Sequence, residues 1–331
     1  MNKSGWKKFF NERAGKCKIL VAGDVMMDKY YHGEVHKFAS DAPVPVAKIV
    51  KRRSTLGAAA NIATNLSLLG CKTYLAGFVG DDHNFETLSS KLVEYNINRD
   101  GLIVTDSPTT TKVRIMSGHR QMFRMDFEDN SPKSDEQFAV LEEYVRLRLS
   151  DGLDAIVLAD YEKGVCTEYF CASVIKEAHH HGVPVVVMPY GSRWIKYAQA
   201  DYVTPNISKI NKLLLSPIDG DDDDAVEHAG RYIMRKFKIK NVLATRSAHG
   251  MTLVTENETA HIPTKLREIF DSAGAADTVA AVFAMALAGG FKPVDGAYIT
   301  NVAAGIVISK SGSYAVSRED ILEALDSKET A

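Results

Sequence analysis

Short apolar runs alternate along the chain with longer segments that have helical periodicity. Four of these runs are almost wholly apolar and end at turn residues: 19–22, 155–159, 183–188 and 241–245. A strand that is apolar at every position is buried on both faces, as the strands of a parallel sheet are. The pattern therefore predicts the strands of a parallel sheet.

The segments between these runs repeat apolar side chains with the period of an α-helix. Seven segments are predicted to be helical: 58–69, 86–95, 135–149, 167–181, 223–236, 276–288 and 296–310. Strands that alternate with helices of this length form βαβ units. We therefore predict an α/β fold with a doubly wound, mostly parallel sheet, in which residues 1–331 form a single domain.

Two regions break this rhythm. Residues 44–50 form a short alternating run after a proline, and residues 112–116 and 121–126 form a pair joined by a short turn. Alternation of this kind is typical of antiparallel strands outside the main sheet. We predict a small β lid, formed by approximately residues 30–52 and 108–127, over the edge where the strands of the large sheet end. Open α/β sheets bind ligands at that edge.

Composition excludes several classes of protein. The 331 residues are 45% hydrophobic and 25% charged, which is ordinary for a globular protein, and the formal net charge of -2 lacks the basic footprint of a nucleic-acid-binding protein. No stretch approaches the roughly 20 continuous apolar residues of a membrane span. Four cysteines in a chain of this length suggest reduced thiols. We expect a cytoplasmic protein that binds neither nucleic acid nor membranes.

The strongest local signal is a run of small residues before an apolar helix. Residues 271–277 read Asp-Ser-Ala-Gly-Ala-Ala-Asp. Small side chains before a helix leave the backbone N–H groups at its N-terminus open to an anion. A carboxylate in the first turn, Asp277, can take a proton from an attacking hydroxyl. The spacing alone supports equally a phosphoryl-transfer site and an acid that only stabilises the helix dipole.

Seven further segments carry a pattern in a fixed order: 23–28 (Gly-Asp-Val-Met-Met-Asp), 42–46 (Ala-Pro-Val-Pro-Val), 57–61 (Gly-Ala-Ala-Ala-Asn), 160–164 (Asp-Tyr-Glu-Lys-Gly), 204–206 (Thr-Pro-Asn), 245–247 (Thr-Arg-Ser) and 301–305 (Asn-Val-Ala-Ala-Gly). Together with residues 271–277, they resemble the motifs of the PfkB/ribokinase family, and within it the heptose-7-phosphate kinases of lipopolysaccharide-precursor synthesis. The resemblance implies a ribokinase-like fold with a β lid.

The resemblance also implies roles for the matching positions. Asp277 would be the catalytic base, and the backbone N–H groups around Gly274, Ala275 and Ala276 would form an anion hole. The sugar would be held by carboxylates and amides, which suit its hydroxyl groups, and by the lid hinge: Asp24, Asp28, Gly57 and Asn61. For Asp24, the capping of a turn after a strand is the alternative.

The phosphate group of the sugar substrate and those of the nucleotide would need further residues to bind them. The phosphate of the substrate would meet cations of the lid: Lys112, Arg114 and Arg124. Exposed lid charge is the alternative for these three. Mg-ATP would be the phosphoryl donor, on a nucleotide side formed by Asn206, Lys209, Thr245, Ser247, Gly250 and Asn301. The family further implies a monovalent cation, K⁺, near the loop of Asp271.

The sequence departs from the family pattern at the expected site. Ala58 stands where the lid hinge usually has a second glycine, and Ala273 and Ala276 alter the anion-hole pattern. Lys209 replaces a carboxylate that supports the magnesium-phosphate water network, and it cannot accept hydrogen bonds from metal-bound water. The family's Asp-Pro-Lys reads Met-Pro-Tyr at residues 188–190, and residues 37–43 replace the usual lid motif.

These departures leave three interpretations open. One is a kinase with an altered substrate or a reduced rate, which we favour because Asp24, Asp28, Asn61 and Asp277 persist. A second is a pseudokinase that binds a sugar phosphate or a nucleotide without turnover. A third is a kinase of the family that acts on another sugar or on a nucleoside.

The favoured interpretation is specific about the reaction. The resemblance implies phosphorylation of a sugar phosphate, heptose 7-phosphate at its carbon-1 hydroxyl. No second, nucleotidyltransferase region is evident in the sequence, so a separate enzyme would perform nucleotide activation. The lid strands have exposed edges that need covering, and a homodimer through the lids is expected, as in relatives.

Overall fold

The computed structural model describes residues 2–118, 120–264, 272–310 and 314–326. Within these residues, a nine-stranded sheet crosses the body in the order β13 (Thr259–Ile262), β12 (Met251–Val254), β11 (Asn241–Thr245), β10 (Tyr202–Val203), β9 (Val185–Met188), β8 (Ala155–Ala159), β1 (Lys18–Gly23), β4 (Lys72–Gly80) and β5 (Asn98–Thr105). From β11 to β5 every neighbouring pair is parallel, and β12 and β13 add an antiparallel edge. The predicted α/β class with a mostly parallel sheet is confirmed.

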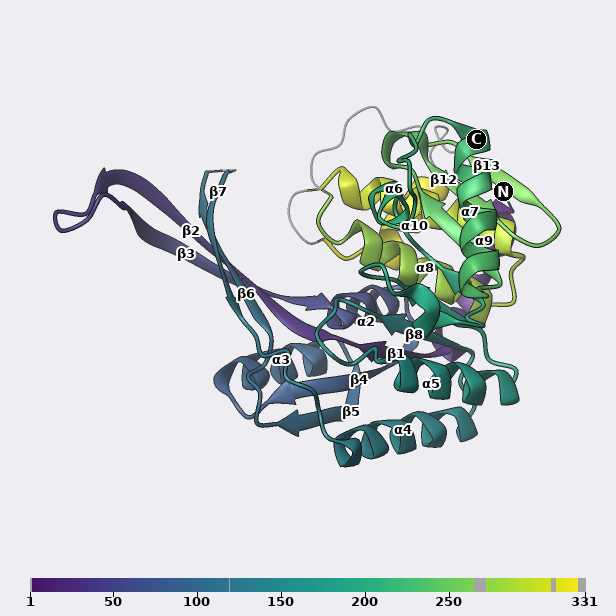
Figure 1. Cartoon of the computed structure of the whole chain (residues 1–331), viewed down its shortest axis with the longest axis horizontal. Coiled ribbons are helices and arrows are strands. Elements are labelled where there is room, and N and C mark those ends of the chain that lie inside the picture. Colours follow the sequence, from purple (N-terminus) through teal and green to yellow (C-terminus); the bar gives the residue numbers. More distant parts are fainter. Residues whose placement is uncertain (1, 119, 265–271, 311–313, 327–331) are drawn as a thin grey trace.

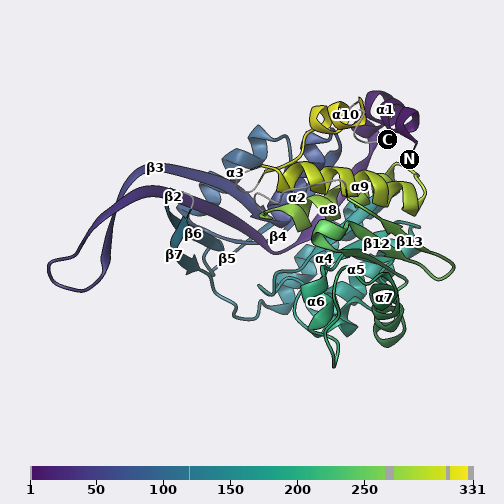
Figure 2. The same cartoon turned by 90° about the horizontal axis from the view of Figure 1, so that it is seen from above.

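Helices cover both faces of this sheet, which explains why its strands are apolar throughout. In β1, Ile19 and Val21 join the core beside α2 (Ala59–Leu68), α8 (Ala275–Ala288) and α9 (Pro293–Ile308). Leu20 and Ala22 point to the other face and join the core beside α4 (Asp135–Ser150), α5 (Glu168–His180) and α7 (Asp223–Phe237) (Figure 2). A strand buried on both faces gains nothing from polar alternation. The remaining α-helices of the described residues are α1 (Lys3–Glu12), α3 (His83–Glu94), α6 (Ile207–Asn211) and α10 (Arg318–Asp326).

A separate four-stranded sheet of described residues forms the lid, in the order β3 (Pro45–Ala58), β2 (Val25–Phe38), β6 (Thr111–Ser117) and β7 (Arg120–Phe127). The ribbon of β2 and β3 extends well beyond the body (Figure 1). Both strands are longer at their inner ends than expected, because β2 begins two residues after β1 and β3 runs directly into α2. The lid strands therefore carry Asp28 and Gly57 at their base.

One strand pairing in the lid differs from expectation. The hairpins β2–β3 and β6–β7 are antiparallel as predicted, but β2 and β6 pair in parallel, with Asp28 opposite Lys112. Parallel neighbours need a long connection, and here the chain passes through β3, α2, β4, α3 and β5 between the two strands. The alternating pattern identifies a strand but carries no information about the direction of its partner.

The N-terminal helix α1 was not predicted, because its segment is rich in charge. Three apolar side chains, those of Trp6, Phe9 and Phe10, are nonetheless buried. The indole of Trp6 stacks on Phe291 with ring centroids 3.7 Å apart.

In the described part of the chain, no helix has both the length and the apolar character needed to cross a bilayer.

The junction between lid and body holds one non-glycine residue in a conformation that favours glycine. Ala58, the N-cap of α2, has φ 52 and ψ -127. Side chains other than hydrogen are crowded in that region of backbone space, at a cost of about 1–3 kcal/mol. The alanine that departs from the family pattern is therefore strained in place.

We predict that Ala58→Gly raises the free energy of unfolding by about 1 kcal/mol, because it relieves this strain. Ala63→Gly is the matched control: Ala63 lies in the interior of α2, so its replacement is expected to cost about 1 kcal/mol or more. Urea unfolding of the three proteins measures both effects. Equal destabilisation by the two substitutions would contradict the strain at Ala58.

Candidate active site

Three segments far apart in the chain converge on the carboxylate of Asp277. Asp277 lies in the first turn of α8 and is 6% exposed. Its Oδ2 accepts a hydrogen bond of 2.6 Å from Nδ2 of Asn61, in the first turn of α2. Its Oδ1 accepts a short hydrogen bond from the hydroxyl of Tyr161, in the loop after β8. Sequence reasoning placed Tyr161 in a matching motif but assigned it no role.

The electrostatic environment suits Asp277 to proton transfer. The pKa of Asp277 is raised to about 6. Burial is the largest cause and the charge of Asp28 adds to it, while the donors Asn61 and Tyr161 and the charge of Lys209 act in the opposite direction. A general base works best when its pKa lies near the working pH. Asp277 is thus ionised at neutral pH, yet basic enough to accept a proton from a hydroxyl.

The start of α8 is arranged to receive an anion. Its N-cap, Gly274, has φ 82 and provides no side chain to cap the helix. The N–H of Ala275 donates to the carbonyl of Ser272 at 3.2 Å. Other backbone N–H groups of an uncapped first turn can serve an external acceptor, and the helix dipole favours negative charge there. The predicted anion-hole residues Ala275 and Ala276 lie in this turn, beside the candidate base.

Asp28 and Gly57 meet on neighbouring lid strands at the edge of the site. Asp28 is 8% exposed, and its carboxylate forms a short ion pair with Arg114 of β6. A Cβ atom at Gly57 would lie 2.6 Å from Oδ2 of Asp28. A side chain at position 57 would displace this carboxylate, so glycine leaves room for Asp28 in its present position.

Asp24 holds a loop in place. Its carboxylate accepts three backbone N–H groups of the loop after β8, from Tyr161 at 2.7 Å, Lys163 at 3.0 Å and Val165 at 3.1 Å. These are the contacts of the turn-capping alternative. Burial, and then the charge of Asp160, raise the pKa of Asp24 to about 6, although the three hydrogen bonds lower it.

The candidate phosphate-binding cations of the lid all have carboxylate partners. Lys112 contacts Asp126 at 3.0 Å and Glu128 at 3.2 Å, and Arg124 contacts Asp126 at 2.9 Å. Glu128 also binds Lys163 of the loop after β8, at 2.8 Å. A substrate phosphate would have to compete with these carboxylates. Sequence reasoning missed both acids, because the predicted pair of strands left open the register that places Lys112 opposite Asp126.

The predicted nucleotide-side residues gather at the ends of β10 and β11. Asn206 caps α6 and forms a parallel bridge with Thr245. Ser247 has φ 54 and Gly250 has φ 80, and a Cβ at Gly250 would lie 2.0 Å from the carbonyl oxygen of Ile262. Asn301, on α9, donates to the carbonyl of Pro263 at 3.0 Å. Asp271 lies outside the described residues.

Lys209 is a half-buried cation between the nucleotide side and the base. Its Nζ lies 5.7 Å from the ring centroid of Tyr190. Burial lowers the pKa of Lys209, while Asp277 and Asp160 oppose this effect. The carboxylate of Asp160 forms an ion pair with Lys196 and accepts a hydrogen bond from the hydroxyl of Tyr197. Among the described residues, Lys209 has no carboxylate within ion-pair distance, and no group of three acidic, histidine or cysteine side chains could hold a metal.

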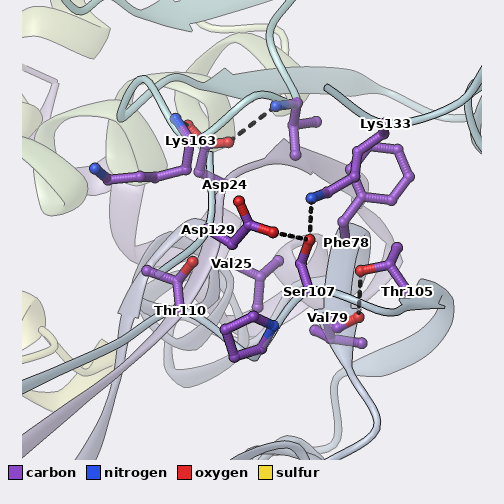
Figure 3. A pocket seen from close by; sticks show the side chains of 12 residues that line it. Asp24, Val25, Phe78, Val79, Thr105, Ser107, Thr110, Asp129, Lys133 and Lys163 are labelled. Atoms are coloured by element: carbon purple, nitrogen blue, oxygen red, sulfur yellow. Dashed lines mark hydrogen bonds between the residues drawn. The ribbon is translucent and has the colours of Figure 1, made fainter. Parts of the chain in front are cut away.

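A small pocket lies beside Asp24, lined by Val25, Thr105, Ser107 and Lys163 among others (Figure 3). Lys133 donates to Ser107 at 2.6 Å, and Ser107 donates to Asp129 at 3.1 Å. The pocket has a volume of about 20 Å³, which leaves room for little more than a water molecule. It does not include Asp277, and we do not assign the substrate to it.

Comparison with known proteins connects this geometry to a family. Residues 16–320 match the family model described as pfkB family carbohydrate kinase. The chain is 39% identical over 311 residues to "Bifunctional protein HldE" of Shewanella piezotolerans, an alignment that covers 94% of this chain and 64% of that relative. A protein of the same description from Methylobacillus flagellatus is 36% identical, with 95% and 64% covered. The chain thus spans less than two thirds of the length of these relatives.

Solved structures show the same fold at lower identity. Ribokinase of Arabidopsis thaliana, complexed with ribose and ATP, aligns with a TM-score of 0.75 and 19% identity over 94% of this chain and 99% of that one. Phosphofructokinase-2 of Escherichia coli, in complex with potassium, gives a TM-score of 0.75 and 16% identity over 93% and 98%. The ribokinase-like fold is confirmed.

We predict a pH-dependent stability difference between the wild type and Asp24→Asn. The folded-state pKa of Asp24, about 6, lies above its usual value near 4, so the folded protein retains a proton that the unfolded chain has lost. This contribution of Asp24 to stability therefore declines as the pH rises from about 4 to about 6, by about 1.4 kcal/mol per pH unit at most.

Asparagine does not titrate, so the free energy of unfolding of the wild type minus that of Asp24→Asn should fall over that range and stay constant above it. Urea unfolding at a series of pH values measures this difference. The contribution of Asp277 cancels because both proteins contain it. A difference independent of pH would contradict the buried, proton-retaining carboxyl group.

Proposed function

The chain belongs to the pfkB family of carbohydrate kinases, and on that premise we propose that it transfers the γ-phosphoryl group of ATP to the carbon-1 hydroxyl of heptose 7-phosphate. Members of this family are phosphotransferases with an alcohol group as acceptor. The similarity of the motifs to those of heptose-7-phosphate kinases supports this substrate. The observation that carries the proposal is the buried carboxylate of Asp277 beside the uncapped N-terminus of α8.

In the proposed reaction, Asp277 accepts the proton of the attacking hydroxyl. The acceptor oxygen forms a bond to the γ-phosphorus, the bond from that phosphorus to the bridging oxygen breaks, and ADP leaves. Charge on the transferred group would be stabilised by the N–H groups of Gly274, Ala275 and Ala276. Asn61 donates a hydrogen bond to Oδ2 of Asp277, and this bond holds the carboxylate in one orientation.

The sugar phosphate would bind between the lid and the body. Asp28 and Asn61 would contact sugar hydroxyls, with Gly57 leaving room for the carboxylate, and Asp24 would act through the loop that it caps. The lid cations Lys112, Arg114 and Arg124 would meet the phosphate of the substrate. Because each cation already has a carboxylate partner, the substrate phosphate would take over part of these ion pairs.

The nucleotide would lie along the ends of β10 and β11, against Asn206, Lys209, Thr245, Ser247, Gly250 and Asn301. Magnesium usually reaches such sites with the substrate phosphates, held by one or two carboxylates and water. The described residues offer no carboxylate group built for it, and Lys209 stands where the family has an acid. We therefore treat magnesium as part of the ATP substrate. A monovalent cation near Asp271 remains part of the proposal.

We propose further that the chain acts in the cytoplasm as a homodimer joined through its lids. The outer strands β3 and β7 present exposed edges, and large apolar side chains on the lid are exposed, with Phe38 at 69%, Val50 at 64% and Phe123 at 61%. A second copy of the chain that covers these strand edges and this apolar surface would be stabilised by both contacts.

A second candidate is a non-catalytic sensor of sugar phosphates or nucleotides. The observation that favours it is Lys209, which supplies charge near the base but cannot hold metal-bound water. Both candidates bind the same ligands, so turnover decides between them.

We predict that Asp277→Asn lowers turnover of ATP with heptose 7-phosphate by about 10²–10⁴-fold, because the base is lost. Affinity for ATP, measured by calorimetry, should change little. In the wild type, kcat/KM should fall as the pH drops below about 6, where Asp277 takes up a proton. Tight binding with the same background turnover in both proteins would favour the sensor and contradict the kinase.

The acceptor is tested by a panel of phosphorylated and unphosphorylated sugars and nucleosides. We expect activity with heptose 7-phosphate, and we predict that Arg124→Gln raises KM for it about tenfold, because one charge-assisted contact is lost. Arg146→Gln is the matched control, a surface arginine that is also ion-paired, on α4. Activity restricted to nucleosides, or an equal effect of both substitutions, would contradict the proposed substrate or the role of Arg124.

A further inference from the structure

The hydroxyl of Tyr161 is the group of the site that the proposed reaction leaves without a role. It donates to Oδ1 of Asp277 while Asn61 donates to Oδ2, so each oxygen of the carboxylate has its own neutral donor. Each carboxylate oxygen carries two lone pairs, and an acceptor hydroxyl can still approach the remaining ones. The contact is thus compatible with Asp277 acting as a base.

We propose that Tyr161 is a positioning residue for the candidate base: its hydroxyl fixes the orientation of the Asp277 carboxylate, favours its ionised form, and so sets the pH below which the site stops working. This inference rests on the proposed function of Asp277. It assigns Tyr161 no contact with the substrate, and it makes no change to the reaction itself.

The phenol is a donor at every pH at which the protein would work. Burial, the charge of Asp277 and the hydrogen bond between the two side chains raise the pKa of Tyr161 well above its usual value. A neutral hydroxyl that donates to a carboxylate stabilises the ionised acid over the protonated one. Such a bond to a charged group is stronger than one between neutral groups.

The position of this hydroxyl is set by contacts on both sides of the loop that carries it. On the body side, Asp24 accepts the backbone N–H of Tyr161 itself, at 2.7 Å, and that of Lys163, at 3.0 Å. On the lid side, the Lys163 ammonium binds Glu128 at 2.8 Å. A loop tied at its backbone and at a side chain can deliver one hydroxyl to one oxygen with little freedom.

The ring also has a packing role. Tyr161 packs against the hydrophobic core cluster that contains Met188, at the end of β9, and its hydroxyl lies 3.7 Å from Sδ of Met188. Replacing the ring would open space beside this cluster. The substitution that isolates the hydroxyl is therefore Tyr161→Phe, which keeps the ring.

The remaining groups that act on Asp277 fix the direction of the expected change. Asp28, from β2, raises the pKa of Asp277, and Lys209, from α6, lowers it. With the Tyr161 hydroxyl removed, Asn61 and Lys209 are left to oppose burial and Asp28. The pKa of Asp277 should then rise, by about one pH unit for the loss of one hydrogen bond to a charged group.

The first experiment does not require turnover. The difference in unfolding free energy between the protein with Asp277 and its Asp277→Asn variant falls with rising pH and levels off above the folded-state pKa of Asp277. In the otherwise unchanged chain it should level off near pH 6. In the Tyr161→Phe background, it should level off about one pH unit higher. An unchanged pH dependence in soluble, cooperatively unfolding proteins would overturn the proposal.

The second experiment uses the kinetic pH profile. Tyr161→Phe should move the acidic limb of kcat/KM upward by about one unit, so the loss relative to wild type at about pH 6 is roughly fivefold larger than at about pH 8. A uniform loss at all pH values would show a packing role alone and would overturn the proposal. Tyr314→Phe is the matched control, because Tyr314 also donates to an aspartate, Asp320, and should leave the profile unchanged.

The two experiments separate this inference from the proposed function. If Asp277→Asn leaves turnover unchanged, the kinase proposal fails, while the stability experiment still reports whether Tyr161 sets the pKa of Asp277. If turnover depends on Asp277 but neither pH dependence moves in Tyr161→Phe, the kinase proposal stands and the role of Tyr161 fails.

Discussion

A buried carboxylate that must remain able to ionise is the constraint on which this structure depends. Removing Asp277 from water disfavours its charge, and this raises its pKa to about 6. Two neutral donors, Asn61 and Tyr161, oppose that effect. They come from α2 and from the loop after β8, so the charge of one side chain requires three elements to keep their relative positions.

Asp24 is a second buried carboxylate held by hydrogen-bond donors, and it acts on Asp277 only through Tyr161. It too is buried with a raised pKa, and its compensating donors are three backbone N–H groups of the loop after β8. A buried acid with several backbone partners orders the segment that supplies them. The loop ordered by Asp24 presents Tyr161 to Asp277, which links the end of β1 to the candidate base through two hydrogen-bonded steps.

The lid is joined to this system by charge as well as by chain connectivity. Glu128 binds both Lys112 of the lid and Lys163 of the ordered loop, and Asp28 binds Arg114 across two lid strands. The backbone at the junction contains the strained Ala58. Lid position, loop position and base orientation are therefore linked through Glu128, Lys163, Asp24 and Tyr161.

The sequence by itself determined four strands of the large sheet (β1, β8, β9 and β11), the principal helices and the place of Asp277, because burial on both faces, helical periodicity and a run of small residues are local patterns. It also placed Asp28, Gly57 and Asn61 in matching motifs. Only the tertiary structure decided that β2 pairs in parallel with β6, that Asp24 caps a loop, and that Asp126 and Glu128 neutralise the lid cations. These facts depend on contacts between residues distant in the chain. A local pattern records whether a side chain is apolar, but not which distant donor or charge will lie beside it.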